Sequence, residues 1–326
     1  MMHMIKQNVP IWIWILLACA VLGVSSAGAL FQHVDEIPPL LRASWRLQLT
    51  ALLLAPFAVM QWKQADDEVR QMYKQKSSLH IIAFSGLFLA VHFGTWVASL
   101  DETSLTHSLL FVTSHPIIIV VGMILLSKSV QSIDFPKKYE MIGALIGFVG
   151  AALTLLSLGE QQGGHTVTLY GDALAFSGGL FVVGYIICGR ILRQWMPIFL
   201  YAFPVTLIAG MLLIPASYIL EPQFQDYGMF GWTDIQFLPW FFLLASIAGF
   251  LGHTGLNTCL RYVSPLIVSV AVTLEPVLGT MIGWLFFDTG TPDAATMLGG
   301  LILLIGLIMV VVSQESGTLE KTNNQK

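Results

Sequence analysis

Charged residues are scarce in this sequence of 326 residues: they make up 10% of the chain, whereas 56% of the residues are apolar. An average soluble domain carries about 25% charged residues. So few charges cannot cover a globule of this size with a solvated surface, which excludes a soluble enzyme, a disordered protein and a secreted disulfide scaffold. The net charge of −4 leaves no basic surplus to neutralise phosphates, so we predict no nucleic-acid partner.

Cysteines and catalytic motifs are equally sparse. The cysteines number only three, fit no zinc or redox spacing and all lie inside apolar runs: Cys19, Cys188 and Cys259. The sequence contains no G-x-S-x-G, H-E-x-x-H or P-loop motif, so we predict no enzyme, no cofactor, no bound metal and no ATP-driven pump. Among the classes of protein considered, a membrane protein is the one that this composition allows.

Ten apolar segments are long enough to cross a membrane as helices, which takes about 17–25 mostly apolar residues. Their continuous runs differ from the alternating strands of roughly ten residues that build a membrane barrel. We therefore predict an all-α membrane protein with spans at 11–33, 39–62, 79–99, 104–126, 139–158, 170–192, 197–219, 236–260, 264–286 and 294–314. Because nine spans follow the first, we interpret the first as an uncleaved helix and not as a signal peptide.

Basic residues sort to one side of these spans. If the N-terminus is cytoplasmic, all of the 15 lysines and arginines except Arg42 and Arg46 fall in cytoplasmic segments, as the positive-inside rule requires. The outer loops carry acids instead, among them Asp288. We therefore expect a multi-pass protein of the cell (inner) membrane whose cytoplasmic ends are the N-terminal segment 1–10 and the C-terminal tail 315–326.

The two halves of the chain resemble each other. The fourth and ninth spans each carry a proline near the middle, preceded by an ionisable residue, which is His115 in one and Glu275 in the other. Glycine spacings also recur between the fifth and tenth spans. Because five spans is an odd number, the second copy must be inverted, which gives two inverted five-helix repeats at 11–158 and 170–314. Secondary transporters with such repeats hold their substrate near the bilayer midplane.

Glu275 is the strongest candidate for a functional residue. It lies about 16 Å into its span at the helical rise of 1.5 Å per residue, which is near the midplane. An ionisable group at that depth is costly unless it faces a partner or water. Pro276 leaves the carbonyl of Val272 without a backbone donor, and this carbonyl with the carboxylate would suit a cation or a proton. The alternative is a protonated or paired carboxyl that only holds helices together.

Further polar and aromatic residues fall at cavity depth in other spans. His115 precedes a proline as Glu275 does, and it could carry a proton or donate to a substrate. The other candidate wall residues are the pair His92 and Trp96 on one helix face, the pair His253 and Asn257 on another, and Tyr185. They predict a central cavity that binds substrate or couples its transport. Hydrogen bonds between helices, and plain packing for the tyrosine, are the alternatives.

Two arginines lie one turn apart inside the second span. Arg42 is close enough to the outer edge of the membrane for its side chain to snorkel to water. Arg46 lies roughly 10 Å deep by the helical rise, and its guanidinium could bind a substrate carboxylate or phosphate through two hydrogen bonds. Arg46 could equally pair with Glu275 or Asp101 in a structural role.

Several short motifs follow one another along the chain. They are Ala43-Ser-Trp-Arg46-Leu47, Leu89-Ala-Val-His92-Phe-Gly-Thr-Trp96, Gly171-Asp172 with Gly189-Arg190, Gly252-His253-Thr254 and Leu274-Glu275-Pro276-Val277. In this order they resemble the EamA-type transporters of the drug/metabolite transporter superfamily, over residues 11 to about 314. One departure is Phe286-Phe287-Asp288, where that family usually has Leu-Gly-Glu.

The resemblance implies ten helices in two inverted repeats, cytosolic termini, and a central cavity lined by helices other than the fifth and tenth. It also implies alternating-access movement of small metabolites, often export. We therefore expect a secondary transporter of a small polar metabolite such as an amino acid or organic ion, with proton coupling left open. Its partners would be that small molecule, the lipid bilayer and, through the glycines of the fifth or tenth helix, a second copy in a homodimer.

Two other classes of function remain open on the sequence. One is a membrane-embedded enzyme that uses the histidines and Glu275 for acid–base or metal chemistry. The other is a non-transporting membrane sensor.

Overall fold

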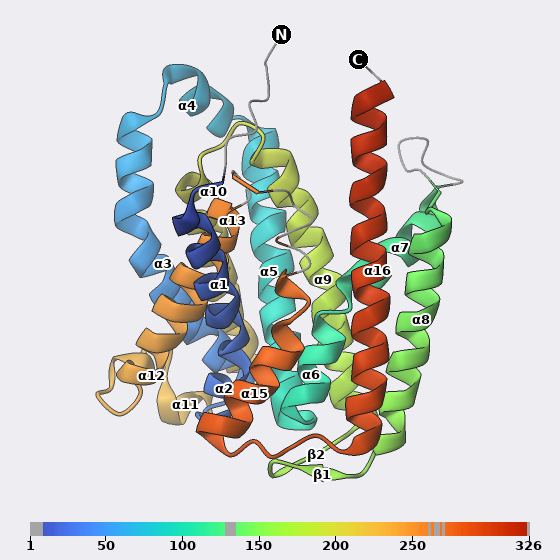
Figure 1. The fold of residues 1–326 in the computed structure, drawn as a ribbon. Coiled ribbons are helices and arrows are strands. Elements are labelled where there is room, and N and C mark those ends of the chain that lie inside the picture. The colour runs from blue at the N-terminus through green and yellow to red at the C-terminus, as the bar shows by residue number, and fades with distance from the viewer. Residues whose placement is uncertain (1–8, 128–134, 260–261, 264–267, 269–270, 325–326) are drawn as a thin grey trace.

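The computed structural model describes residues 9–127, 135–259, 262–263, 268 and 271–324, and within them the chain is almost entirely helical (Figure 1). The first half contains α1 (Ile11–Ser25), α2 (Ala27–Gln32), α3 (Pro39–Gln64), α4 (Asp67–Tyr73), α5 (Lys76–Glu102), α6 (Leu105–Val112), α7 (His115–Leu126), α8 (Lys138–Thr154) and η1 (Leu155–Ser157). After the strands β1 (Gln161–Gln162) and β2 (His165–Thr166), the second half contains α9 (Leu169–Leu192), α10 (Ile198–Leu220), α11 (Phe224–Tyr227), η2 (Gly231–Thr233), α12 (Leu238–Leu243), η3 (Leu244–Thr254), α13 (Gly255–Cys259), α15 (Glu275–Phe287) and α16 (Ala294–Asn324).

Nine of the ten predicted spans are confirmed, within the described residues, as helices long and apolar enough to cross a membrane. The remaining prediction, 264–286, is represented by the shorter apolar helix α15, whose 13 residues extend about 20 Å at the helical rise. Residues 264–267 and 269–270 of that prediction lie outside the described residues. The last helix continues past the predicted end of its span, since α16 runs to Asn324.

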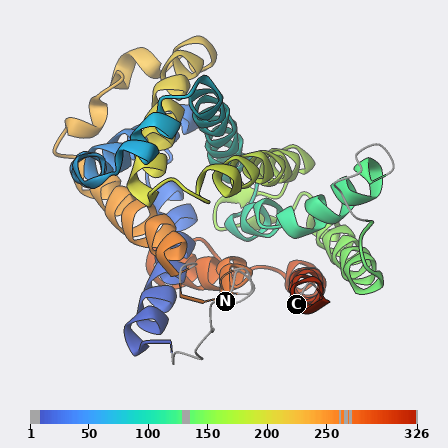
Figure 2. The ribbon, with the colours of Figure 1, turned by 90° about the horizontal axis from the view of Figure 1, so that it is seen from above.

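Two helices stand apart from the others at one side of the bundle. Figure 2 shows α8 and α16 side by side there, while α3, α5, α9 and α10 pack together elsewhere. Glycine allows α8 and α16 to touch through their backbones: a Cβ on Gly150 would lie 2.3 Å from the amide nitrogen of Leu303, and one on Gly306 would lie 2.4 Å from that of Gly147. The glycines in question therefore pack within one chain, and the homodimer stays a prediction.

Prolines set where two helices begin. The predicted fourth span is not one continuous helix, because α6 ends at Val112 and α7 starts at His115, with Pro116 in its first turn. In the second half, α15 starts at Glu275, again with Pro276 in the first turn. Proline lacks the N–H that a first turn leaves unpaired, so it favours this position and breaks the helix before it. His115 and Glu275 thus hold equivalent places at helix starts.

The predicted eighth span, 236–260, also differs from a regular α-helix. Its middle, η3, is a π-helix over Leu244–Thr254, between the α-helical segments α12 and α13. A π-helix bonds residue i to i+5 and so turns successive side chains by a smaller angle than an α-helix does. Hydropathy alone does not reveal it, since the apolar composition of the segment is the same whichever helix it forms.

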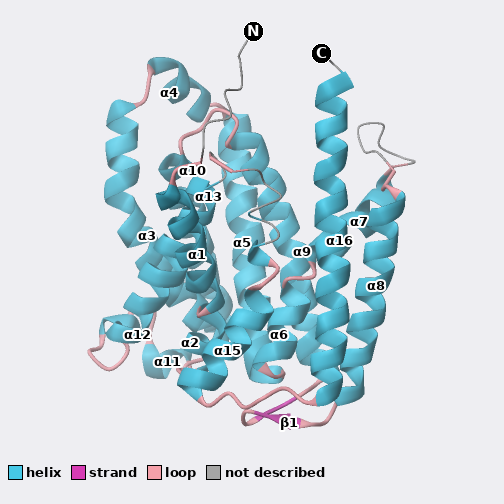
Figure 3. Ribbon diagram, viewed as in Figure 1, coloured by secondary structure: helices cyan, strands magenta, loops and turns pink. Residues whose placement is uncertain are grey.

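A short hairpin marks one end of the bundle, which we call the hairpin end (Figure 3). Gln161 pairs with Thr166 and Gln162 with His165. The turn between them has φ of +59° at Gly163 and +85° at Gly164, which are the positive values that a tight hairpin turn needs and that glycine supplies without strain. The last turn of α16 and the short helix α4 lie at the opposite end of the bundle, on different sides of it (Figure 1).

Candidate functional site

A small cavity lies between the helices of the main bundle. Its volume is about 40 Å³, which is room for roughly three water molecules. Six elements contribute to its walls: α3, α5, α9, α10, η3 and α13. The lining residues are Arg46, Leu47, Thr50, Leu54, Leu89, Phe93, Tyr185, Ile198, Ala202, Thr206, Gly249, His253, Thr254 and Asn257. Four of the eight residues predicted for the site, Arg46, Tyr185, His253 and Asn257, are therefore brought together here.

Arg46 is the charged residue of the cavity wall. It is 1% exposed, and its guanidinium carbon lies 4.2 Å from the centre of the Phe93 ring, a cation–π arrangement. Its Nε and Nη1 atoms are buried and bond to none of the described residues. The alternative of a structural pairing with Glu275 or Asp101 is not found within the described chain, where no ion pair joins Arg46 to an acid.

Phe93 connects the predicted histidines and tryptophan to this wall. The centre of its ring lies 4.8 Å from that of His92, 5.7 Å from that of Trp96 and 6.2 Å from that of His253. His92 and Trp96 stack on each other at 6.1 Å. The helical spacing predicted a shared face for that pair, but it did not reveal that Phe93 holds the cluster together.

Only some polar atoms of this cluster have hydrogen-bond partners. His92 Nδ1 donates to the carbonyl oxygen of Gly178 on α9, 2.8 Å away, which leaves Nε2 as the acceptor of a neutral ring. Trp96 Nε1 is buried and has no hydrogen-bond partner in the described part of the chain. Asn257 uses its side-chain amide for its own helix and donates to the carbonyl of His253 at 2.8 Å. Tyr185 stacks on Tyr201, with 6.2 Å between ring centres.

Glu275 and His115 do not line the cavity, although both lie within electrostatic range of it. Glu275 interacts electrostatically with Arg46, and His115 with His92. Neither side chain forms a hydrogen bond with another described residue. At the first position of α15 the carboxylate of Glu275 also lies at the positive end of the helix dipole. Stabilising the start of this helix is therefore the structural alternative to a role in transport. Of the eight predicted residues, six thus lie in one cluster at the cavity, and Glu275 and His115 lie outside it.

The expectation that Arg42 snorkels to water is wrong. Its side chain is fully buried and forms an ion pair with Asp101 at the end of α5, in which Nη2 contacts both carboxylate oxygens. Nη1 donates to the carbonyl of Phe31 at 2.7 Å. A partly exposed acid 59 residues away in the sequence replaces water as the neighbour of this charge.

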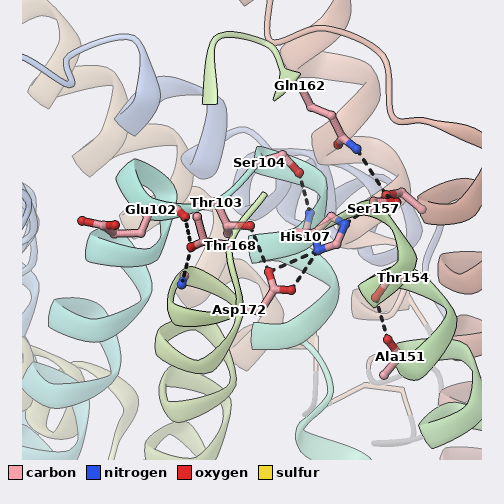
Figure 4. A network of polar contacts seen from close by, with 12 residues as sticks. Glu102, Thr103, Ser104, His107, Ala151, Thr154, Ser157, Gln162, Thr168 and Asp172 are labelled. Carbon is pink, nitrogen blue, oxygen red and sulfur yellow. Dashed lines mark hydrogen bonds and ion pairs between the residues drawn. The ribbon is translucent and has the colours of Figure 1, made fainter. Parts of the chain in front are cut away.

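A second polar cluster at the hairpin end was not predicted (Figure 4). His107 lies between two partners: its Nδ1 is 3.0 Å from a carboxylate oxygen of Asp172, and its Nε2 is 2.9 Å from the hydroxyl of Thr296. Thr103 also donates to Asp172 at 2.9 Å. The hydroxyl of Thr296 donates to Ser157 at 2.9 Å. We call these five residues the His107 cluster; it joins α5, α6, α9, η1 and α16.

The cluster continues to the start of α16 through Asp293, which accepts the hydroxyl of Ser157 at 2.8 Å and the backbone N–H of Thr296 at 2.7 Å. Partial burial by itself would raise the pKa of this carboxyl, but these hydrogen bonds outweigh it and hold the pKa of Asp293 below its usual value. Asp293 thus caps the helix as a carboxylate. A sequence signal existed, because an acid three residues before a threonine at the start of an apolar run is a cap pattern.

Sequence profiles place the chain among membrane transporters. The model of the EamA-like transporter family matches residues 10–156 and 169–312, so nearly the whole chain is covered by two copies of this unit. The protein is therefore a multi-pass membrane protein. It belongs to the EamA-like transporter family, within the drug/metabolite transporter superfamily, as the motifs indicated.

Known structures support the fold alone. A solved structure described only as "Crystal structure of protein" has a TM-score of 0.59 at 16% sequence identity, over 91% of this chain and 96% of that one. None of the curated proteins matches the chain.

Proposed function

We propose that this protein is a secondary transporter that moves a small polar metabolite, an amino acid or an organic ion, through the central cavity by alternating access. The observation that carries this proposal is that the cavity lies between helices of both EamA units: Arg46 and Phe93 come from the first match, and Tyr185 and His253 from the second. A site between two repeats opens to one side or the other when the repeats rock against each other.

Several features support an inverted arrangement of the two units. The pairs His115-Pro116 and Glu275-Pro276 each start a helix after a break. With both termini cytoplasmic, the basic loop around α4 faces the cytoplasm and the hairpin end faces outward. The polar contacts of the His107 cluster would then close the outer end, as expected of an exporter or exchanger that takes its substrate from the cytoplasm.

Transport by purified protein in liposomes tests the proposal. Vesicles loaded with a mixture of unlabelled amino acids and organic acids should accumulate a radiolabelled member by counterflow, whereas empty vesicles should not. Thermal unfolding should first show that the protein is folded. If such protein then takes up none of these compounds, the proposal that it is a transporter is contradicted. Accessibility of single cysteines introduced in the hairpin turn and in α4, from each side of the membrane, tests the orientation.

Glu275 is the residue we propose for coupling or substrate contact. Glu275→Gln should change the pH profile of counterflow, while Glu36→Gln, an exposed acid at the hairpin end, serves as the matched control and should behave as the wild type. An unchanged rate and pH profile in Glu275→Gln would remove the proposed role.

A further inference from the structure

The guanidinium of Arg46 is a buried charge whose hydrogen-bonding capacity is unused. The side chain is 1% exposed, and two of its three nitrogens are buried without a partner among the described residues. Leaving a buried charge without hydrogen bonds costs several kcal/mol. A protein folds around such a group only where other interactions compensate, and a ligand that supplies the missing acceptors would be bound strongly. We propose that Arg46 binds the carboxylate of the transported substrate, which is a small organic acid; this inference rests on the proposed transport function.

The surroundings of Arg46 select the kind of anion. Phe93 covers one face of the guanidinium at 4.2 Å, so a ligand meets the N–H groups along the edge of the plane and not its face. Two N–H groups of a guanidinium match the two oxygens of a carboxylate in one plane. Arg46 is also the one lysine or arginine among the described residues that line this cavity, which fits a single negative charge and not a phosphate dianion.

The other lining residues indicate the chemistry of the rest of the ligand, beyond its carboxylate. Three leucines line the cavity beside Phe93: Leu47, Leu54 and Leu89. They favour an apolar substituent on the part of the acid that meets them, because a polar group in contact with leucine side chains would be desolvated without a partner. The volume of about 40 Å³ is too small for such a molecule, so binding must be accompanied by widening of the cavity.

Glu275 provides a way to distinguish two kinds of carboxylate ligand, simple organic acids and α-amino acids. Its charge interacts with that of Arg46 without forming an ion pair with it. An acid without an amino group uses Arg46 alone, whereas an α-amino acid would also place its ammonium group toward Glu275. Both kinds of ligand carry the carboxylate that Arg46 would bind.

Ligand-induced thermal shifts of the purified protein test the assignment, because a ligand of the folded state raises its apparent stability by mass action. The probes are the monocarboxylates from acetate to 3-phenylpropionate and α-amino acids with matching side chains, each compared with its uncharged or cationic amide, together with inorganic phosphate. We expect carboxylate-bearing probes to raise the Tm and their amides and phosphate to leave it unchanged. Loss of the response in Glu275→Gln for amino acids only would identify the zwitterion as the ligand.

Two substitutions of Arg46 make the test specific. Arg46→Met removes the donors and should abolish the response, and Arg46→Lys keeps a positive charge without the paired donors and should weaken binding at least tenfold. Arg70→Gln, at the α4 end outside the cavity, is the control and should bind as the wild type. If Arg46→Met does not fold, Arg46→Lys decides alone.

The assignment is overturned if amides or phosphate stabilise the protein as well as carboxylates do, if none of the probes binds, or if both Arg46 variants respond as the wild type. Its failure differs from failure of the proposed function. A protein that carries neutral or cationic metabolites in counterflow remains a transporter whose substrate lacks the carboxylate, whereas a folded protein that neither binds nor carries any metabolite is not the transporter proposed.

Discussion

Arg42 and Arg46 lie one turn apart on α3 and are both buried, yet their surroundings are opposite. Arg42 has the carboxylate of Asp101 and the carbonyl of Phe31 as acceptors, whereas Arg46 has an aromatic ring and a cavity. The same contrast separates two regions of the molecule. At the hairpin end the side chains of the His107 cluster are bonded to one another, while in the central site two nitrogens of Arg46 and that of Trp96 have no partner among the described residues.

The difference shows how burial can be interpreted in a transporter. Polar groups that satisfy one another hold helices in place, and their removal destabilises the protein. Polar groups buried without partners lower the stability of the unliganded protein and are expected to meet a ligand. The following substitutions test this comparison, in order of expected effect.

Asp101→Asn should have the largest effect. It removes the counter-charge of a fully buried guanidinium and should lower the free energy of unfolding by about 3–5 kcal/mol, measured by unfolding in mixed detergent micelles. Asp67→Asn, which breaks the exposed pair with Arg70, should cost at most about 1 kcal/mol. The double variant Arg42→Met/Asp101→Leu should regain most of the loss. If Asp67→Asn lowered the free energy of unfolding by several kcal/mol and Asp101→Asn did not change it, the contrast between buried and exposed ion pairs would be contradicted.

Asp172→Asn should weaken the hairpin end. Its carboxylate accepts hydrogen bonds from His107 and Thr103 in a buried site, and charged hydrogen bonds of this kind contribute about 1.5–3 kcal/mol. The same unfolding measurement should show a loss of that size, and the exposed Asp226→Asn should show none. Equal stability of Asp172→Asn and the wild type would mean that the His107 cluster does not fasten this end.

Asp293→Ala should cost about 1 kcal/mol at neutral pH, because it removes the N-cap of α16. Since the pKa of this carboxyl is lower in the folded than in the unfolded protein, its contribution is complete above the unfolded-state pKa and is lost as the pH falls through the folded-state value. The Tm curves of variant and wild type should therefore converge in acid. Asp293→Asn keeps a cap without a charge and should show no such pH dependence; a constant gap for Asp293→Ala at all pH values would argue against the carboxylate cap.

Arg46→Met should have the smallest effect on the unliganded protein. An apolar side chain of similar length replaces an unsatisfied charge, so the free energy of unfolding should stay within about 1 kcal/mol of the wild type or rise. Unfolding without ligand measures this, and Arg42→Met is the matched comparison because it leaves Asp101 without its partner. A loss as large as that of Asp101→Asn would show that Arg46 is already satisfied.

The membrane spans were predictable because hydropathy is a local sum. About twenty apolar residues in a row determine a helix of membrane length wherever the neighbours lie, and nine spans agree with that expectation within the described residues. The helix starts at His115 and Glu275 also carry a local signal, in the proline that follows each residue, although the break between α6 and α7 was not predicted. The π-helix η3 and the hairpin end contacts left no comparable signal.

The site was predictable in part for the same reason. Spacing of three or four residues identifies a common helix face, and it indicated His92 with Trp96 and His253 with Asn257 correctly as neighbours. Phe93 was missed because an apolar residue in an apolar span has no distinguishing pattern. Whether Arg42 faces water or an acid could not be foreseen either, because its partner is 59 residues away.

The sequence by itself determined a protein for the membrane: its scarcity of charge, the length of its apolar runs and the sorting of its basic residues are properties of the chain alone. Only the tertiary structure decided which of the few buried polar groups are satisfied. The partners of Arg42 and His107 come from other elements of the fold. Two nitrogens of Arg46 have no partner among the described residues, because six elements leave a cavity beside this side chain. Hydrogen bonds depend on distances of about 3 Å between such elements, and those distances are set by packing.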